Sequence, residues 1–289
     1  MLLLVGTIPN EEMPLTFGPV RYQPDKLTIG DYSLEGQYVT LGTAAMICSA
    51  SATCQAIGCD LPHALVVGDT GMGDGTMKLL KFLVEEMPKI KPNVVTLHYI
   101  LPTRDPFINF VNTAHQMEKR PFLIADAGAL LNAKAVKVAT KFDLFTPDPG
   151  EISFLADPNA AHPAYVQHYI FSQDQTSVPR LSSEAYANGD APKYLLVKAP
   201  TDHIVVEGKI VATINEPSIP TLEPIGGTGD TITGQVSAMI SSGMDVVEAC
   251  IAASKINRTA GLLARPAPDT TIAKFIPFIG EAVKIVLGK

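Results

Sequence analysis

The chain has 289 residues, of which 46% are hydrophobic and 18% charged, and its formal net charge is −7 at pH 7. This apolar content suffices for a buried core and excludes a disordered chain. The net negative charge gives no overall basic field, so neither a nucleic acid nor a membrane is an expected partner. The low charged fraction favours a homo-oligomer in which copies of the chain cover part of each other's surface.

The start of the chain and its cysteines predict a cytoplasmic protein. The apolar run Met1–Val5 is too short for a signal sequence or a membrane span, and two glutamates follow soon after it. No Cys-x-x-Cys pair and no histidine in metal-ligand spacing accompanies the four cysteines, which is typical of free thiols in a reducing compartment. These cysteines are Cys48, Cys54, Cys59 and Cys250.

Apolar strands and amphipathic helices alternate along the chain. Strands are predicted at residues 1–5, 64–67, 94–97, 122–125, 142–145 and 194–197, each bounded by turn signals. Between them, helices are predicted at residues 41–57, around Leu79–Val84, and from Pro106 toward Arg120. A β-hairpin is expected over residues 203–214, followed by helices from Gly229 to a last one near residues 272–287.

This alternation predicts an α/β fold with a mostly parallel sheet and helices on both of its faces, a three-layer sandwich. No internal repeat and no Gly/Ser linker divides the chain, so we expect a single domain over residues 1–289.

The segment Gly226-Gly227-Thr228-Gly229 precedes a predicted helix and is a candidate anion site. Glycines allow successive backbone N–H groups to turn toward one point, and a helix start adds partial positive charge. Asp230 at this helix start could take a proton from a substrate hydroxyl. The alternative is a tight turn with Thr228 or Asp230 capping the helix.

The segment Thr146–Glu151 also joins a strand to a helix. Asp148 and Glu151 could hold a hydrated Mg²⁺, because this ion keeps several waters and needs few protein ligands. Alone, the segment is more typical of a capping box, with Asp148 as N-cap and Glu151 three residues later. Both segments, however, are expected beyond the carboxyl ends of parallel strands, where open α/β sheets bind ligands.

Five segments resemble the ADP/ATP-dependent NAD(P)H-hydrate dehydratases, which are ribokinase-like in fold. Thr146-Pro147-Asp148-Pro149-Gly150-Glu151 is similar to the family's TPHPGE, and Gly226–Gly234 to its GG(S/T)GDxLxG. Asp126–Leu130 resembles its DADAL and Leu196-Val197-Lys198 its LKG strand; Val67–Gly73, which contains Gly71, resembles an altered VGPGLG.

The resemblance implies phosphorylation of the hydroxyl of hydrated NADH or NADPH by ATP or ADP, followed by loss of phosphate. It implies that Asp230 activates that hydroxyl, that Gly227, Thr228 and Gly229 stabilise the phosphoryl group, and that Glu151 helps to place Mg²⁺.

The chain departs from the family pattern at several positions. Asp148 replaces the usual His, Ala199 a Gly, and Asp202 a Thr; Asn257-Arg258 replaces a His-Gly pair in the helix that flanks the nucleotide. A carboxylate at Asp202 would repel nucleotide phosphates unless a metal or a changed geometry intervened. Residues 84–120 read as an inserted strand and helix, and the substrate does not follow from the sequence.

Further positions have a functional and a structural interpretation. Gly68–Gly75, with Gly71 at its centre, lacks the Lys-Ser/Thr ending of a P-loop and is either a substrate contact or a structural turn. Asp126 follows a strand and is either a substrate contact or a helix N-cap. Lys198 is either a contact to nucleotide phosphate or an exposed lysine, and the six scattered histidines have no metal spacing.

Three hypotheses remain. The first is a nucleotide-dependent NAD(P)H-hydrate dehydratase, and the second a sugar or vitamin-precursor kinase of the ribokinase-like superfamily. The third is a nucleotide-binding regulator without turnover, although a pure binder would not need both Asp230 and Glu151.

Overall fold

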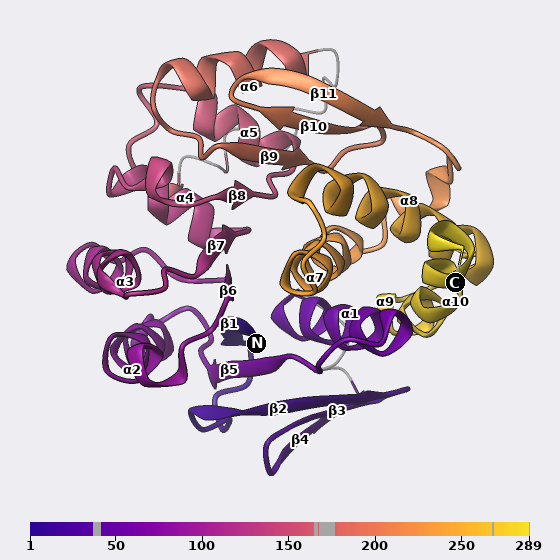
Figure 1. The fold of residues 1–289 in the computed structure, drawn as a ribbon, viewed down its shortest axis with the longest axis horizontal. Helices are drawn as coiled ribbons and strands as arrows, with labels where there is room; N and C mark the ends of the chain where they lie inside the picture. Colours follow the sequence, from indigo (N-terminus) through magenta and orange to yellow (C-terminus); the bar gives the residue numbers. More distant parts are fainter. Residues whose placement is uncertain (37–41, 165–166, 168–176, 268, 289) are drawn as a thin grey trace.

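A mixed sheet forms the centre of the computed structural model, which describes residues 1–36, 42–164, 167, 177–267 and 269–288. In these residues eleven strands join in the order β11-β10-β9-β8-β7-β6-β1-β5-β2-β3-β4 (Figure 1). The strands are β1 (Leu2–Ile8), β2 (Thr16–Gln23), β3 (Lys26–Ile29), β4 (Tyr32–Glu35), β5 (His63–Gly68), β6 (Val94–His98), β7 (Phe122–Ala125), β8 (Leu144–Phe145), β9 (Tyr194–Val197), β10 (Asp202–Val206) and β11 (Lys209–Ile214).

The middle of the sheet is parallel and its two edges are antiparallel. Strands β5, β1, β6, β7, β8 and β9 run in the same direction, so their carboxyl ends lie along one edge of the sheet. The predicted hairpin forms β10 and β11 at one side. Strands β2 to β4 at the other side were not predicted, because Gly18 and Pro19 interrupt the alternating pattern of β2.

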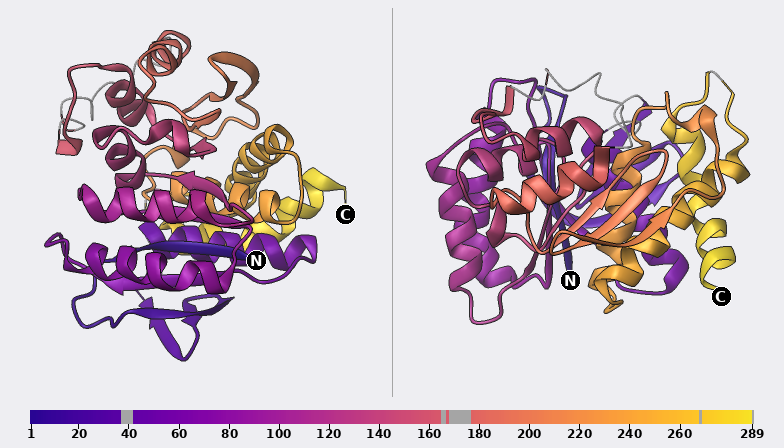
Figure 2. Two further views of the ribbon diagram at one scale, coloured as in Figure 1. Left: turned by 60° about the vertical axis from the view of Figure 1, so that its left-hand side comes forward. Right: turned by 90° about the horizontal axis from the view of Figure 1, so that it is seen from above.

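Helices cover both faces of the sheet, which gives three layers (Figure 2). Alternate residues of β1 enter opposite cores: Leu2 and Leu4 on one face, Leu3 and Val5 on the other. The first core is covered by α1 (Gly42–Ile57), α7 (Thr228–Ser241), α8 (Val246–Ala264), α9 (Ile272–Phe275) and α10 (Ile279–Leu287). The second is covered by α2 (Asp74–Ile90), α3 (Asp105–Gln116), α4 (Gly128–Ala135), α5 (Pro149–Ala156) and α6 (Val178–Ala187).

The predicted fold class, a mostly parallel α/β sandwich, is therefore confirmed, with a few local differences. The strand predicted at residues 142–145 is only Leu144–Phe145. The last predicted helix is divided into α9, a 3₁₀ turn at Ile276–Phe278 and α10. Leu41, the predicted start of the first helix, lies outside the described residues. No helix in the described ranges is long and apolar enough to cross a membrane.

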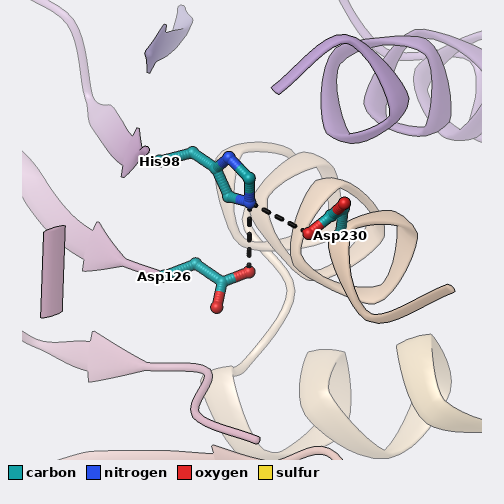
Figure 3. Close-up of side chains that lie close together, drawn as sticks. All are labelled: His98, Asp126 and Asp230. Carbon is teal, nitrogen blue, oxygen red and sulfur yellow. Dashed lines mark hydrogen bonds and ion pairs between the residues drawn. The ribbon is translucent and has the colours of Figure 1, made fainter. Parts of the chain in front are cut away.

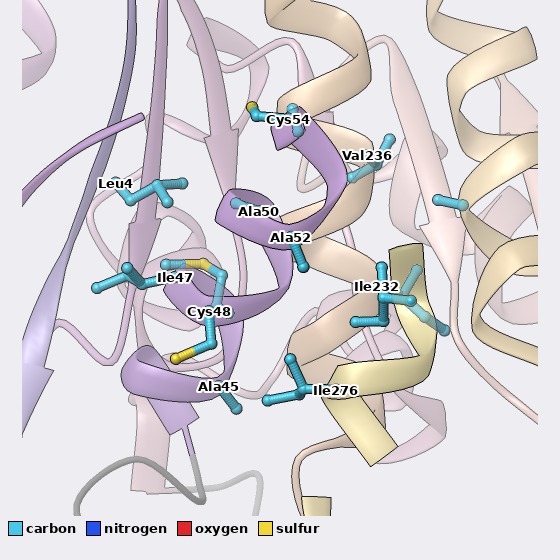
Figure 4. Close-up of a cluster of buried hydrophobic side chains, with 14 of the residues drawn as sticks. Leu4, Ala45, Ile47, Cys48, Ala50, Ala52, Cys54, Ile232, Val236 and Ile276 are labelled. Carbon is cyan, nitrogen blue, oxygen red and sulfur yellow. The ribbon is translucent and has the colours of Figure 1, made fainter. Parts of the chain in front are cut away.

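Helices α1 and α7 pack closely because small residues face each other. A Cβ at Gly234 of α7 would lie 2.2 Å from the carbonyl oxygen of Met46 in α1, which only glycine avoids. Ala45, Ala50, Ala52 and Val236 line the surrounding cluster (Figure 4). At the end of this contact, the N–H of Gly42 donates to the Asp230 carboxylate at 2.9 Å. The packing of two helices thus places the first turn of α1 against the candidate base.

The segment 84–120, which reads as an insertion, contributes a central element of the sheet. It contains the end of α2, all of β6 and α3, and β6 lies between β1 and β7. Strand β6 ends at His98, which is buried, at the same sheet edge as Asp126. An element without a predicted role therefore brings a further polar side chain to that edge.

Candidate functional site

A pocket of about 580 Å³ lies beyond the carboxyl ends of the central strands. Parallel strands direct the loops that follow them to this edge, where ligands bind in open α/β sheets. Its lining contains the following predicted site residues: Asp126, Asp148, Glu151, Lys198, Gly226, Gly227, Thr228, Gly229, Asp230 and Asn257. Gly71 is the predicted site residue that the lining does not contain.

The glycine segment forms the start of α7, as the sequence predicts. Gly227 adopts a φ of 96°, and a Cβ there would lie 3.2 Å from the Ile272 side chain, so the position requires glycine. The hydroxyl of Thr228 donates to the Ile225 carbonyl at 3.1 Å. Because first-turn N–H groups have no acceptor within their own helix, this end of α7 presents donors and positive dipole to the pocket.

Asn257 of α8 supports this first turn from behind. Its Nδ2 donates to the carbonyl of Thr228 at 3.1 Å. Its Oδ1 accepts from the Thr231 hydroxyl at 2.7 Å and from the Gln235 amide at 3.0 Å. The side-chain amide is therefore engaged with α7, and Asn257 orients the first turn of this helix. Its predicted contact with a nucleotide stays a prediction.

Asp230 is held at both carboxylate oxygens. Oδ1 lies 3.0 Å from Nε2 of His98, and Oδ2 accepts the N–H of Gly42 at 2.9 Å. The side chain is 15% exposed and lines the pocket. Burial raises the pKa of Asp230, but His98, Lys198 and the Gly42 amide together bring it below its ordinary value. Asp230 is thus an ionised acceptor of fixed orientation beside the start of α7.

Lys198 forms its ion pair with Asp126. Its Nζ lies 2.7 Å and 2.8 Å from the two Asp126 oxygens, and the Thr233 hydroxyl donates to Asp126 at 2.6 Å. Burial alone would lower the pKa of Lys198, but Asp126 and other nearby carboxylates raise it above its ordinary value. A Cβ on Gly229 would lie 3.5 Å from this ammonium. The fixed cation therefore lies directly beside the glycine segment.

Asp148 and Glu151 form the capping box that was the alternative interpretation. The N–H of Glu151 donates to Asp148 at 2.7 Å, and the N–H of Asp148 donates to Glu151 at 2.8 Å. Both residues also line the pocket. Burial and the carboxylates of Asp148 and Asp126 raise the pKa of Glu151 well above its ordinary value. The local structure is a helix cap. It also places carboxylates close together, and a bound cation would reduce the repulsion between them.

The sequence did not identify His98 as a site residue. It is fully buried, and its Nε2 lies 3.0 Å from Asp230 and 3.7 Å from Asp126 (Figure 3). A polar residue directly after the apolar strand 94–97 was the available signal, the same signal that singled out Asp126. The sequence spacing gave no indication of a site at His98, because its partners are distant in sequence: Asp126 directly after β7 and Asp230 in α7.

Two departures from the family pattern compensate each other. Asp202, 2% exposed, accepts from Nε and Nη2 of Arg258 at 3.2 Å and 3.1 Å. Nη2 of Arg258 also donates to the carbonyls of Ala199 and Pro200 at 3.0 Å and 2.9 Å. The guanidinium therefore neutralises the carboxylate that the sequence placed among nucleotide phosphates. It also joins α8 to the loop between β9 and β10.

The loop Gly68–Gly75 contains an anion site that the chain itself fills. The carboxylate of Asp69 accepts N–H groups from Gly71, Met72, Gly73, Gly75 and Thr76 at 2.9–3.3 Å. Burial raises the pKa of Asp69, but these backbone donors bring it below its ordinary value. Gly71 lies outside the pocket lining and its N–H is bonded, which favours the structural interpretation of the loop. Its predicted contact with a substrate stays a prediction.

Comparison with known structures defines the fold class. A Bacillus subtilis ADP/ATP-dependent NAD(P)H-hydrate dehydratase, co-crystallised with ATP and Mg²⁺, has a TM-score of 0.57 at 17% identity over 99% of this chain and 88% of that one. An ADP complex of Bacillus subtilis pyridoxal kinase has a TM-score of 0.55 at 12% identity, over 89% and 90%. The chain therefore shares the ribokinase-like fold of these two enzymes.

Sequence comparison identifies the family. The family model described as NAD(P)H-hydrate dehydratase matches residues 101–274, and the chain belongs to this family. An uncharacterized protein of Methanocaldococcus jannaschii is 40% identical over 223 residues, which cover 77% of this chain and 91% of that protein.

Removing Arg258 should strongly destabilise the fold. We expect Arg258→Met to lower the free energy of unfolding by about 3 kcal/mol, because it leaves the Asp202 carboxylate buried without a cation. Adding Asp202→Asn should recover most of this loss. Chemical denaturation of the single and double variants measures both effects.

The control is Arg180→Met, which breaks an exposed ion pair with Glu184. It should change the free energy of unfolding by about 1 kcal/mol or less. Equal losses in Arg258→Met and Arg180→Met would contradict the account of the buried pair.

Proposed function

We propose that the protein transfers a phosphoryl group from ATP or ADP to the hydroxyl of hydrated NADH or NADPH, and then releases phosphate. The observation that carries this proposal is the ionised carboxylate of Asp230, fixed beside the N-terminus of α7 inside the pocket. Membership of the NAD(P)H-hydrate dehydratase family supports the substrate.

In the first step Asp230 accepts the proton of the substrate hydroxyl. The hydroxyl oxygen forms a bond to the terminal phosphorus of the nucleotide, and the bond from that phosphorus to the leaving phosphate oxygen breaks. The N–H groups of Thr228 and Gly229 and the dipole of α7 stabilise the charge on the transferring group. Lys198 adds positive potential beside Gly229 while it remains paired with Asp126.

In the second step the phosphorylated substrate loses its phosphate. The bond between the ring carbon and the phosphate oxygen breaks, and the adjacent ring carbon loses a proton to water, so that the electrons of that C–H bond form the double bond of NADH or NADPH. The anion site at α7 receives the departing phosphate. Asp126, which lies behind Lys198 and lines the pocket, and Asp148 are the carboxylates that we propose to contact the substrate.

The carboxylates at the start of α5 fit a magnesium ion. Mg²⁺ prefers carboxylate oxygens and retains several waters, and Glu151 and Asp148 lie together in the pocket, where each carboxylate accepts the backbone N–H of the other residue. When bound, Mg²⁺ neutralises phosphate charge. Glu151 is the residue that we propose to hold it, and burial together with the carboxylates of Asp148 and Asp126 raises the pKa of this side chain.

The second candidate is a kinase for a small alcohol, and one observation favours it. Lys198 and Arg258, the basic side chains in the described pocket lining, are both paired with aspartates. A dinucleotide carries a pyrophosphate that commonly meets a cation or a helix N-terminus. A small uncharged alcohol carries no phosphate and therefore needs no cation in its binding site.

Asp230→Asn should abolish turnover while preserving the fold. We expect kcat to fall by about 10²–10⁴-fold, because the amide cannot accept the hydroxyl proton. The assay supplies ATP or ADP with Mg²⁺ and hydrated NADPH, and follows the recovery of NADPH absorbance; a parallel panel of alcohols is analysed for phosphorylated products.

Recovery of NADPH only with nucleotide supports the dehydratase, and accumulation of a phosphorylated alcohol supports the kinase. Nucleotide binding with neither product would favour a regulator. Full activity in Asp230→Asn would show that another group is the base. Lys137→Ala, on an exposed lysine that does not line the pocket, serves as a control and should retain wild-type kcat.

The affinity for Mg²⁺ should rise as the pH rises from the ordinary pKa of a glutamate to the raised pKa of Glu151. Glu151 retains a proton at higher pH than an ordinary glutamate, and Mg²⁺ must displace that proton to bind. Below the raised pKa the ion competes with the proton, and above it the competition disappears. Titration calorimetry with Mg²⁺ and nucleotide at several pH values measures this.

Glu151→Gln is the matched variant, since it cannot ionise but keeps the size of the side chain. Its Mg²⁺ affinity should be weaker and should lose this part of the pH dependence. An unchanged pH dependence in Glu151→Gln would exclude Glu151 as the titrating ligand.

A further inference from the structure

We propose that His98 is a positioning residue for the base: it donates its Nε2–H to Asp230 and so directs the free lone pairs of that carboxylate toward the substrate hydroxyl. The inference rests on the proposed role of Asp230. His98 does not line the pocket and has no exposed surface, so it acts through Asp230 and does not touch the substrate.

The hydrogen bonds around the ring define its tautomer. Nδ1 of His98 lies 3.1 Å from the hydroxyl of Thr43, and Nε2 lies 3.0 Å from Oδ1 of Asp230. With the proton on Nε2, His98 donates to the carboxylate while Thr43 donates to Nδ1. With the proton on Nδ1, the Nε2 lone pair would face an ionised carboxylate oxygen. The first arrangement satisfies both contacts for an ionised Asp230.

The charged groups around the ring favour Asp230 as the partner. Asp126, directly after β7, lies 3.7 Å from Nε2, beyond hydrogen-bond distance, and both of its oxygens accept from Lys198, which directly follows β9. From the end of β6, the ring of Tyr99 meets the imidazole edge-on at a centroid distance of 4.2 Å. From α1, Thr43 and Gly42 contribute a hydroxyl and an N–H. His98 therefore has one carboxylate within hydrogen-bond distance, and it is the proposed base.

His98, Asp126 and Asp230 could also be regarded as a metal site, because one ligand atom of each lies within 4.8 Å of the others. The Lys198 ammonium argues against this, since it contacts both oxygens of Asp126 at 2.7–2.8 Å. A cation at the centre of the three side chains would lie beside a buried positive charge. The geometry serves a hydrogen bond better than a metal.

Gly6 of β1 leaves space for Thr43 and His98. A Cβ at Gly6 of β1 would lie 2.6 Å from the Thr43 hydroxyl and 2.6 Å from the carbonyl oxygen of His98. Any larger residue at position 6 would displace the threonine that fixes the imidazole. A residue in the middle of a central strand is thus restricted to glycine by the two groups that orient Asp230.

Two substitutions separate the hydrogen bond from the packing of the ring. Gln at position 98 can place an amide N–H near the original Nε2, whereas Asn places its amide near Nδ1 and ends short of Asp230. We expect His98→Asn to lower kcat by about 100-fold with KM changed less than about threefold. His98→Gln should recover at least tenfold of that loss.

The pH profile gives a readout that a purely structural role would not move. In His98→Asn, burial acts on Asp230 without its principal partner, so the pKa of this carboxyl should rise and the acid limb of kcat should move to higher pH. In His98→Gln the acid limb should remain closer to that of the wild type. Equal losses in both variants, with unmoved acid limbs, would overturn the proposal.

A spectroscopic measurement decides the matter even where a variant folds poorly. Long-range ¹H–¹⁵N spectra of the wild-type chain distinguish histidine tautomers, and the signal absent from His98→Gln assigns His98. The Nε2–H form is expected, and an Nδ1–H form would overturn the proposal. If Asp230→Asn retains full activity, the proposed function fails; if only the His98 results fail, that function stands without this positioning residue.

Discussion

A buried carboxylate must be compensated by hydrogen bonds and positive charge, and the arrangement of the whole sheet edge meets this requirement for Asp230. Three elements distant in sequence contribute: α1 gives the N–H of Gly42, β6 gives His98, and α7 places Asp230 at its own positive end. The close contact of α1 with α7 at Gly234 brings the first of these into range. The close packing of α1 against α7 is therefore required for the hydrogen bond that orients Asp230.

The same principle explains why the unusual residues of this chain are tolerated. Lys198 is paired with Asp126, and Arg258 with Asp202, so each buried acid has its own base. A change from the family pattern at Asp202 is matched by one at Arg258, which lies 56 residues away in sequence. Among the described residues, Glu151 and Asp148 form no ion pair with a lysine or arginine, and this difference is the reason that we propose them, and not the paired acids, for a cation.

Much of the fold followed from the sequence, because buried parallel strands are short apolar runs and each ends in a recognisable turn. Strands β2 to β4 did not follow, since Gly18 and Pro19 obscure the alternation of β2.

Most of the predicted site residues lie together in the pocket lining, because Asp126, Lys198 and Asp230 come directly after strands or at a helix start. His98 and Arg258 were missed as partners, because their roles depend on contacts across the sheet edge that sequence spacing does not encode. Gly71 is a different case: its loop has the pattern of an anion site, but the Asp69 carboxylate accepts the backbone N–H groups of that loop, and a substrate contact at Gly71 stays a prediction.

The most direct test of this account is a crystal structure of the protein with ADP, Mg²⁺ and aluminium fluoride, which imitates a phosphoryl group in transfer. If Asp230 is the base, the fluoroaluminate should contact the N–H groups of Thr228 and Gly229 and lie beside the carboxylate of Asp230, and Mg²⁺ should lie next to Glu151. A fluoroaluminate bound instead at the loop Gly68–Gly75, or outside the pocket, would contradict the assignment of Asp230 as the base.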